Sequence, residues 1–341
     1  MLRALDGCIK CGACLAECPV LRLEGRQAFP GPRRLAVEGP HFSRELIALK
    51  DPLEMCTTCS RCESACPSRL PLTDAMARMR SKVGPGNNEG RRRLLQYVHS
   101  LGRTIPSEGR LVAPHMGRTL FFPGCVGESR ALASTQAALD LLLRVDDGLF
   151  VPDDWSCCGS PLEKVGEFNE VEKLRDANAA LFEVAEEIVT SCPGCAVQLR
   201  RANDVESLHV LEYLYESVGI SRLELHSHRP IRVALHSPCH LLRTVGPHAM
   251  DYAREILSAV PGVQVVDVDE DECCGGGGGV ASTRPELARK MSRRKVNSAV
   301  QAGAELLVAP CPFCVVNLRK VGGMRVEEFT SFLASLSSGR S

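Results

Sequence analysis

The chain has 341 residues, 44% of them hydrophobic, which is enough for two or three domains with buried cores. Forty-one Lys and Arg residues balance forty-one Asp and Glu residues, so the chain lacks the basic surplus that nucleic-acid-binding proteins carry. No apolar run reaches the ~18 residues of a membrane-spanning helix, and no apolar signal segment precedes Cys8. Eighteen cysteines in such a chain indicate metal binding in a reducing cytoplasm. We expect a cytoplasmic protein that reaches the inner face of a membrane only through a partner subunit.

The first eight cysteines form two copies of one pattern. They are Cys8-x2-Cys11-x2-Cys14-x3-Cys18-Pro19 and Cys56-x2-Cys59-x2-Cys62-x3-Cys66-Pro67. In ferredoxins with two cubane [4Fe–4S] clusters, the fourth cysteine of each run ligates the other cluster. This crossing assigns one cluster to Cys8, Cys11, Cys14 and Cys66, and the other to Cys56, Cys59, Cys62 and Cys18. Structural zinc also uses Cys-x2-Cys pairs, but two identical four-cysteine runs favour iron–sulfur.

The segments around these cysteines read as helices. The pattern predicts a helix over residues 41–49 and another over 70–83, so we expect a helical two-cluster ferredoxin-type domain over residues 1–84. Gly and Pro residues then end the second helix. We expect residues 85–117 to be a linker with one short helix near residues 91–100.

The remaining ten cysteines form an internal repeat. Cys125 … Cys157-Cys158-Gly159 … Cys192-x2-Cys195 recurs as Cys239 … Cys273-Cys274-Gly275 … Cys311-x2-Cys314. Strand and helix patterns alternate in each copy, which predicts two α/β domains with small parallel sheets, over residues 118–226 and 227–341. In each copy, the first cysteine and the Cys-x2-Cys pair follow strands directly. Five thiolates per copy should therefore meet at the carboxyl ends of the strands.

These paired motifs resemble the cysteine-rich CCG domains of the heterodisulfide reductase family. The whole chain is similar to the fused form in that family, in which one polypeptide carries a ferredoxin module and two CCG domains. It also resembles the iron–sulfur subunits of glycolate oxidase and anaerobic glycerol-3-phosphate dehydrogenase. The resemblance implies one non-cubane [4Fe–4S] cluster per CCG domain, with a disulfide cleaved between the two. The implied ligands are Cys125, Cys157, Cys158, Cys192 and Cys195, then Cys239, Cys273, Cys274, Cys311 and Cys314. We expect Cys239, Cys273 and Cys274 to be the catalytic cysteines, with His240 beside them.

Three functional hypotheses follow. The first is an oxidoreductase subunit that reduces a disulfide such as the coenzyme M–coenzyme B heterodisulfide. The second is an electron-relay subunit that passes electrons from a flavin-dependent 2-hydroxy acid or glycerol-3-phosphate dehydrogenase to a quinone or cytochrome. The third is a zinc-bearing assembly protein without a redox role. The sequence shows no flavin or nicotinamide site, so the redox hypotheses require a partner: a membrane cytochrome b, a flavin-containing reductase or a flavin dehydrogenase.

Two smaller signals lie near the second CCG motif. Five glycines at positions 275–279 match a dinucleotide fingerprint only trivially, because no strand-then-helix context surrounds them. We expect this backbone to pass close to a cluster. His236 and His240 flank Cys239. His240 could protonate a thiolate leaving group, or either histidine could donate a hydrogen bond to a cluster sulfur.

Overall fold

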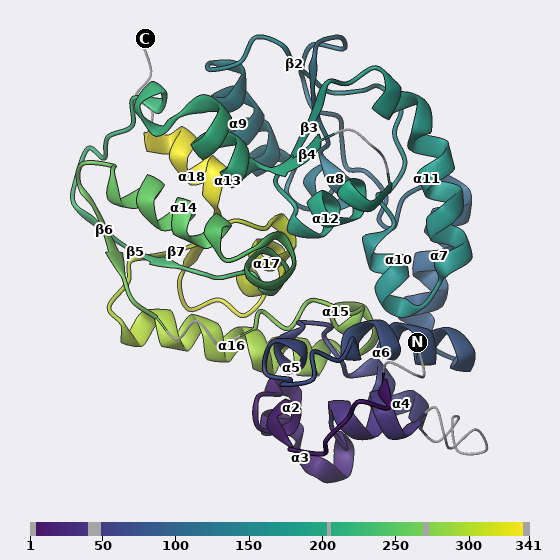
Figure 1. Ribbon diagram of the computed structural model, residues 1–341. Helices are drawn as coiled ribbons and strands as arrows, with labels where there is room; N and C mark the ends of the chain where they lie inside the picture. The colour runs from purple at the N-terminus through teal and green to yellow at the C-terminus, as the bar shows by residue number, and fades with distance from the viewer. Residues whose placement is uncertain (1–4, 40–48, 203–205, 269–272, 337–341) are drawn as a thin grey trace.

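The computed structural model describes residues 5–39, 49–202, 206–268 and 273–336 (Figure 1). An N-terminal helical module is followed by two α/β units, each built on a four-stranded parallel sheet. The predicted fold class is confirmed: a helical two-cluster module precedes two repeated α/β domains.

The N-terminal module is held together by helix α6. The described residues before Gly84 contain helices and no strand. The helices are α2 (Ala13–Ala16), α3 (Pro19–Ala28), η1 (Arg33–Glu38), α4 (Lys50–Glu54), α5 (Arg61–Ser64) and α6 (Leu72–Val83). Leu72, Met76 and Met79 form the buried face of α6, which contacts η1 and α4. Helix α6 is the helix expected over residues 70–83, whereas residues 41–48 of the other expected helix lie outside the described part of the chain.

The segment expected to be a linker contains a well-packed helix, α7 (Glu89–Leu101). Its N-cap residue is Asn88, whose side chain accepts a hydrogen bond from the backbone N–H of Arg91 at 3.0 Å. The Arg91 side chain is buried and donates to Glu167 in the first α/β unit at 2.7 Å. Helix α7 therefore joins the module to the sheets.

The first α/β unit has strand order β2-β1-β3-β4, with every neighbouring pair parallel. Its elements are β1 (Thr119–Phe121), α8 (Gly124–Gly127), α9 (Leu132–Leu143), β2 (Leu149–Phe150), α10 (Ser160–Val165), α11 (Phe168–Glu183), β3 (Glu187–Thr190), α12 (Pro193–Ala202) and β4 (Glu206–His209). The strands are buried almost throughout, as expected for a parallel sheet covered on both faces.

The second unit repeats this design with order β6-β5-β7-β8, again all parallel. Between the sheets lie α13 (Val210–Glu212), η4 (Tyr213–Val218) and η5 (Ile220–Leu223). The unit comprises β5 (Ile231–Leu235), η6 (Leu241–Val245), α14 (His248–Ser258), β6 (Val263–Val266), α15 (Val280–Thr283), α16 (Pro285–Gln301), β7 (Leu306–Ala309), α17 (Pro312–Arg319), β8 (Arg325–Glu328) and α18 (Phe329–Leu336).

The two units share one apolar core. Leu139 of α9 and Leu333 of α18 belong to the same buried cluster, which also contains Phe121 of β1 and Val233 of β5. Helices α9 and α18 pack against each other, and Figure 1 shows them side by side. This shared core places the carboxyl ends of the two sheets in a fixed relation.

Glu328, at the end of β8, is a buried carboxyl group that should make stability depend on pH. Burial raises its pKa from 4.5 to about 7, although the backbone N–H of Ser331 donates to it at 2.8 Å. Between pH ~4.5 and ~7 the unfolded chain ionises this group and the folded chain does not, so stability falls as the pH rises through that window. We expect Glu328→Gln to stabilise the protein by about 2–3 kcal/mol at pH 8 and to change little at pH 4.5.

Urea unfolding at the two pH values measures this difference. Glu183→Gln, on the exposed end of α11, is the matched control and should have little effect at either pH. An equal effect of Glu328→Gln at pH 4.5 and pH 8 would contradict the ionisation argument.

Candidate metal centres

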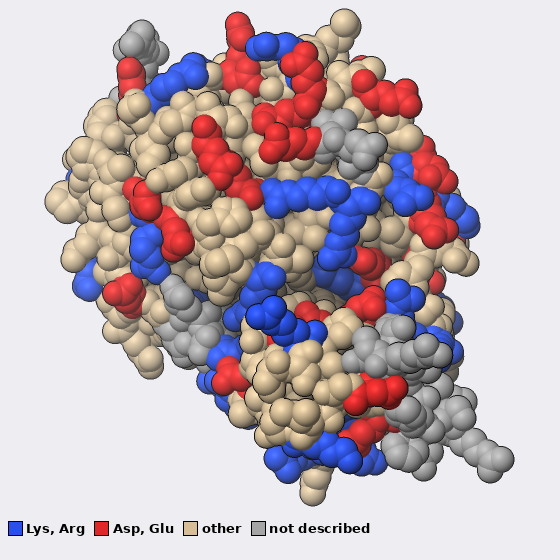
Figure 2. Space-filling model, in the orientation of Figure 1, with Lys and Arg blue, Asp and Glu red and all other residues tan. Residues whose placement is uncertain are grey.

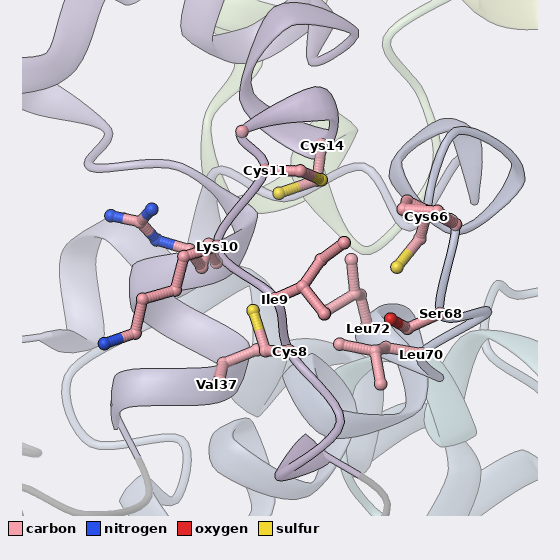
Figure 3. Close-up of a pocket in the computed structure, with 13 residues that line it drawn as sticks. Cys8, Ile9, Lys10, Cys11, Cys14, Val37, Cys66, Ser68, Leu70 and Leu72 are labelled. Atoms are coloured by element: carbon pink, nitrogen blue, oxygen red, sulfur yellow. The ribbon is translucent and has the colours of Figure 1, made fainter.

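The first site gathers cysteines from both N-terminal runs. Cys8, Cys11, Cys14 and Cys66 line a cavity of about 20 Å³, and Figure 3 shows their side chains around it. Two left-handed residues, Lys10 and Gly12, turn the backbone around the first three. Cys66 arrives from the second run, after α5. The structure thus brings together the four cysteines that the sequence assigns to one cubane cluster.

The second site lies deeper and contains the other four cysteines of the two runs. Cys18 has Cys56 and Cys59 as electrostatic neighbours, and Cys62 has all three. Burial raises the pKa of Cys18 to about 12 and that of Cys59 to about 11. Because a ligating thiol must lose its proton, a metal is required to hold this group as thiolates.

In the first CCG unit, five thiols converge beyond the carboxyl ends of the strands. Cys125 follows β1 within α8, and Cys192 follows β3. The Sγ atoms of Cys158 and Cys195 are 3.2 Å apart, well beyond the ~2.05 Å of a disulfide. The backbone N–H of Gly159 donates to the Sγ of Cys157 at 3.4 Å. Buried thiols that approach one another without bonding form a soft donor set for iron.

The second CCG unit repeats this arrangement. Cys239 follows β5 and Cys311 follows β7, and the backbone N–H of Gly275 donates to the Sγ of Cys273 at 3.3 Å. Hydrogen bonds from Cys239 and Cys274 lower the pKa of Cys273 well below its usual value. All eighteen cysteines are free thiols. Five thiols per unit, all buried or half-buried, fit an iron–sulfur group better than the four ligands of structural zinc.

Two buried histidines border the second CCG site. The Nδ1 of His240 lies 3.9 Å from the Sγ of Cys239, and burial lowers the pKa of His240 to about 3. Burial also lowers the pKa of His236 to about 3. Burial therefore opposes the charged form of both rings, and the Nδ1 of His240 is close enough to the Sγ of Cys239 for a hydrogen bond.

A cavity of about 440 Å³ lies between the two CCG sites. Nine of the ten CCG cysteines line it, all except Cys273. The side chains of Arg93, Arg130, Lys164 and Lys320 also line it, and the described lining contains no Asp or Glu. Figure 2 shows Lys and Arg side chains around a hollow in the region where Figure 1 places α10, α12, α15 and α17. A ligand in this cavity can reach both sites, and the four cationic side chains can pair with anionic groups that it carries.

The glycine run at positions 275–279 docks the second CCG unit onto the ferredoxin-type module. A Cβ atom on Gly278 would lie 2.2 Å from the carbonyl oxygen of Cys56, and one on Gly277 would lie 2.4 Å from that of Thr57. Cys273 is an electrostatic neighbour of Cys59. The close approach expected from the glycines is therefore made to the backbone that carries Cys56, at the second ferredoxin-type site.

The buried guanidinium of Arg80 donates hydrogen bonds across this junction. No sequence motif identifies Arg80 as a junction residue. Its nitrogens donate to the carbonyl oxygens of Cys56 at 2.7 Å and Gly278 at 3.0 Å. They also donate to those of Leu53 at 3.0 Å and Lys164 at 2.9 Å. One side chain thus ties the ferredoxin-type module to both CCG units.

Comparisons with known proteins agree with this architecture. The cysteine-rich CCG domain matches residues 119–200 and 233–319, and a 4Fe-4S dicluster domain matches residues 4–70. The chain is a CCG-domain iron–sulfur protein.

Two relatives come from methanogens, and each is one subunit of a larger enzyme. The CCG-domain protein is 29% identical to a subunit of the fumarate reductase (CoM/CoB) of Methanothermobacter marburgensis, over 93% of this chain and 68% of that protein. It is 27% identical to a subunit of the dihydromethanophenazine:CoB–CoM heterodisulfide reductase of Methanosarcina acetivorans, over 93% of this chain and 89% of that protein. The match to the second relative thus extends over nearly the full length of both proteins.

The chain also resembles a bacterial iron–sulfur subunit and, in fold alone, one solved structure. The probable glycolate oxidase iron-sulfur subunit of Bacillus subtilis is 23% identical over 92% of this chain and 88% of that protein. The crystal structure of a hypothetical protein from Helicobacter pylori shares the fold, with a TM-score of 0.64 at 9% identity over 92% of this chain and 69% of that one.

These findings confirm the coarse functional prediction. The CCG-domain protein is an oxidoreductase subunit that carries iron–sulfur clusters, transfers electrons and works with other redox subunits. Among the described residues, no helix combines the length and apolar character needed to cross a membrane.

Proposed function

We propose that this chain takes electrons from a redox partner through its ferredoxin-type module and reduces a disulfide in the cavity between its CCG units. The coenzyme M–coenzyme B heterodisulfide is the leading substrate, because the names of two relatives contain both coenzymes. The observation that supports this most is the 440 Å³ cavity, since cysteines of both CCG units line it.

The proposal includes four clusters. Two cubane [4Fe–4S] clusters would occupy the domain over residues 1–84, one held by Cys8, Cys11, Cys14 and Cys66 and the other by Cys56, Cys59, Cys62 and Cys18. One non-cubane cluster would occupy each of the domains over residues 118–226 and 227–341, held by the five cysteines of each CCG motif. Bound there, these clusters would supply the single-electron steps that thiols alone do not provide.

The chain's own residues would bind and orient the disulfide. Cleavage of one disulfide takes two electrons and two protons and yields two thiols. Lys164 and the three arginine and lysine side chains around it would hold the anionic substituents. His240 also lines the cavity, where its neutral ring would donate a hydrogen bond beside Cys239. Cys239, Cys273 and Cys274 would form the catalytic side because the second CCG site adjoins the ferredoxin-type module.

The relay function is the second candidate, and the glycolate oxidase iron-sulfur relative favours it. In that case a flavin dehydrogenase would donate electrons, and a quinone or cytochrome would accept them. In the disulfide reductase, the donor would be a membrane cytochrome b or a flavin-containing reductase. With each of these functions, we expect the chain to be cytoplasmic and to reach the inner face of the membrane through a partner subunit.

Anaerobic turnover with a reduced viologen dye separates these functions. We expect purified protein with roughly sixteen irons, four for each of four clusters, to reduce the coenzyme M–coenzyme B heterodisulfide. Chain loaded with the same iron but inactive on the heterodisulfide, and co-purifying with a flavin dehydrogenase, would instead establish the relay. A zinc-loaded, colourless protein would refute both redox functions.

A further inference from the structure

We propose that His236 supplies a nitrogen ligand to iron in the second CCG site, which gives that site a donor that the first site lacks. This inference rests on the proposed cluster in that domain. It concerns a histidine for which the cysteine motif has no place, since five thiols already complete the motif without it.

The ring of His236 is buried among cysteines without a polar partner. It is 1% exposed, and within the described residues neither ring nitrogen has a hydrogen-bond partner. Its nearest donor atom and the Sγ atoms of Cys274 and Cys314 all lie within 4.8 Å of one another. A nitrogen and a sulfur bound to one metal ion at ~2.0 and ~2.3 Å can be up to about 4.3 Å apart, so only a small adjustment is needed.

The backbone holds this ring at the site. His236 directly follows β5, and its backbone N–H donates to the carbonyl oxygen of Val308 on β7 at 2.8 Å. A buried imidazole with two unpaired nitrogens costs free energy, and native proteins rarely leave such groups unsatisfied. A metal bond from one nitrogen would offset this cost, because a neutral imidazole offers one lone pair.

The first CCG unit provides an internal comparison. Its Phe122 occupies the equivalent position, since its backbone N–H donates to the carbonyl oxygen of Val189 on β3, also at 2.8 Å. The Phe122 ring packs edge-on against Trp155, with the ring centroids 5.1 Å apart. The same backbone position therefore carries an apolar ring in the first unit and a metal-binding ring in the second.

A nitrogen donor would make the two CCG sites unequal. Ligand identity sets the potential of an iron–sulfur centre, and here an imidazole would add to the five thiolates of the motif. We therefore expect the two CCG sites to differ in reduction potential. The second CCG site is also the one that adjoins the second ferredoxin-type site.

Pulsed EPR on the reduced holoprotein, prepared with and without ¹⁵N-histidine, tests this ligand directly. We expect a strong nitrogen coupling that changes with the isotope, and we expect His236→Phe, which installs the residue of the first unit, to remove it and shift that site's reduction potential. His240→Asn is the matched control, because His240 is the neighbouring ring at Cys239, and the coupling should persist in it.

The proposal is overturned if the labelled wild-type protein shows only the weak coupling of a hydrogen-bonded nitrogen, or if the strong coupling survives in His236→Phe. It is also overturned if His240→Asn removes the coupling. The wild-type labelling and the His240→Asn variant decide the question even if His236→Phe fails to fold. Protein with four iron atoms in this site and heterodisulfide turnover, but without nitrogen coupling, would refute this inference and leave the proposed function standing.

Discussion

Replacing Cys273 with Ser is expected to lower disulfide reduction by at least about 100-fold and to remove the iron of the second CCG site. Cys273 hydrogen-bonds with Cys239 and Cys274 and accepts the N–H of Gly275, so it is the thiol most readily held as thiolate in that unit. A serine hydroxyl keeps its proton and is a poor ligand for soft metals. Anaerobic turnover and iron analysis of the purified variant measure both effects.

Cys157→Ser is the matched control, because Cys157 occupies the equivalent position in the first unit and accepts the N–H of Gly159. It should remove iron from the first CCG site only. In both variants, the EPR signals of the site around Cys8 should persist, since that cavity contains no CCG residue. Loss of every signal together would contradict the modular arrangement, and full turnover of Cys273→Ser would remove this cysteine from the catalytic group.

The sequence was informative wherever a spacing carries the chemistry. The offset of four residues between Cys14 and Cys18 puts the fourth thiol beyond its own turn, and the structure indeed places Cys66, and not Cys18, beside Cys8. Alternating strand and helix patterns predicted parallel sheets, and the cysteines that follow the strands predicted that the thiols meet at one edge. Both sheets have that form.

Features that arise from docking between modules could not be predicted. Arg80 lies four residues after Met76, on the buried face of α6, whereas Arg78 is exposed, but only the packed structure shows which carbonyl groups the Arg80 guanidinium meets. The glycines at positions 275–279 were expected to approach a cluster, but the sequence did not show that they pack on the Cys56–Thr57 backbone. His236 was visible beside Cys239, yet its lack of polar partners among the described residues depends on burial by distant segments.

Arg80→Met is expected to destabilise the protein by about 3–5 kcal/mol and to weaken the docking of the ferredoxin-type module. Met fills a similar volume but leaves buried carbonyl oxygens without donors, and each such oxygen costs about 1–3 kcal/mol before the structure relaxes. The stability of Arg80→Lys should lie between those of the wild-type protein and Arg80→Met, because one ammonium group lacks the planar set of donors that a guanidinium has. Denaturant unfolding of the holoprotein gives the free energies, and limited proteolysis near residues 84–88 reports on docking.

Arg78→Met is the control from the same helix. Arg78 is exposed and pairs with Asp74 at 3.1 Å, so its loss should cost less than about 1 kcal/mol. The docking argument also predicts a kinetic effect: electrons should leave the reduced ferredoxin-type module more slowly in Arg80→Met, because Gly278 and Cys56 lose their shared donor. Stability and electron transfer equal to those of Arg78→Met would show that the close fit of Gly277 and Gly278 against Cys56 and Thr57 is sufficient to hold the junction without the guanidinium.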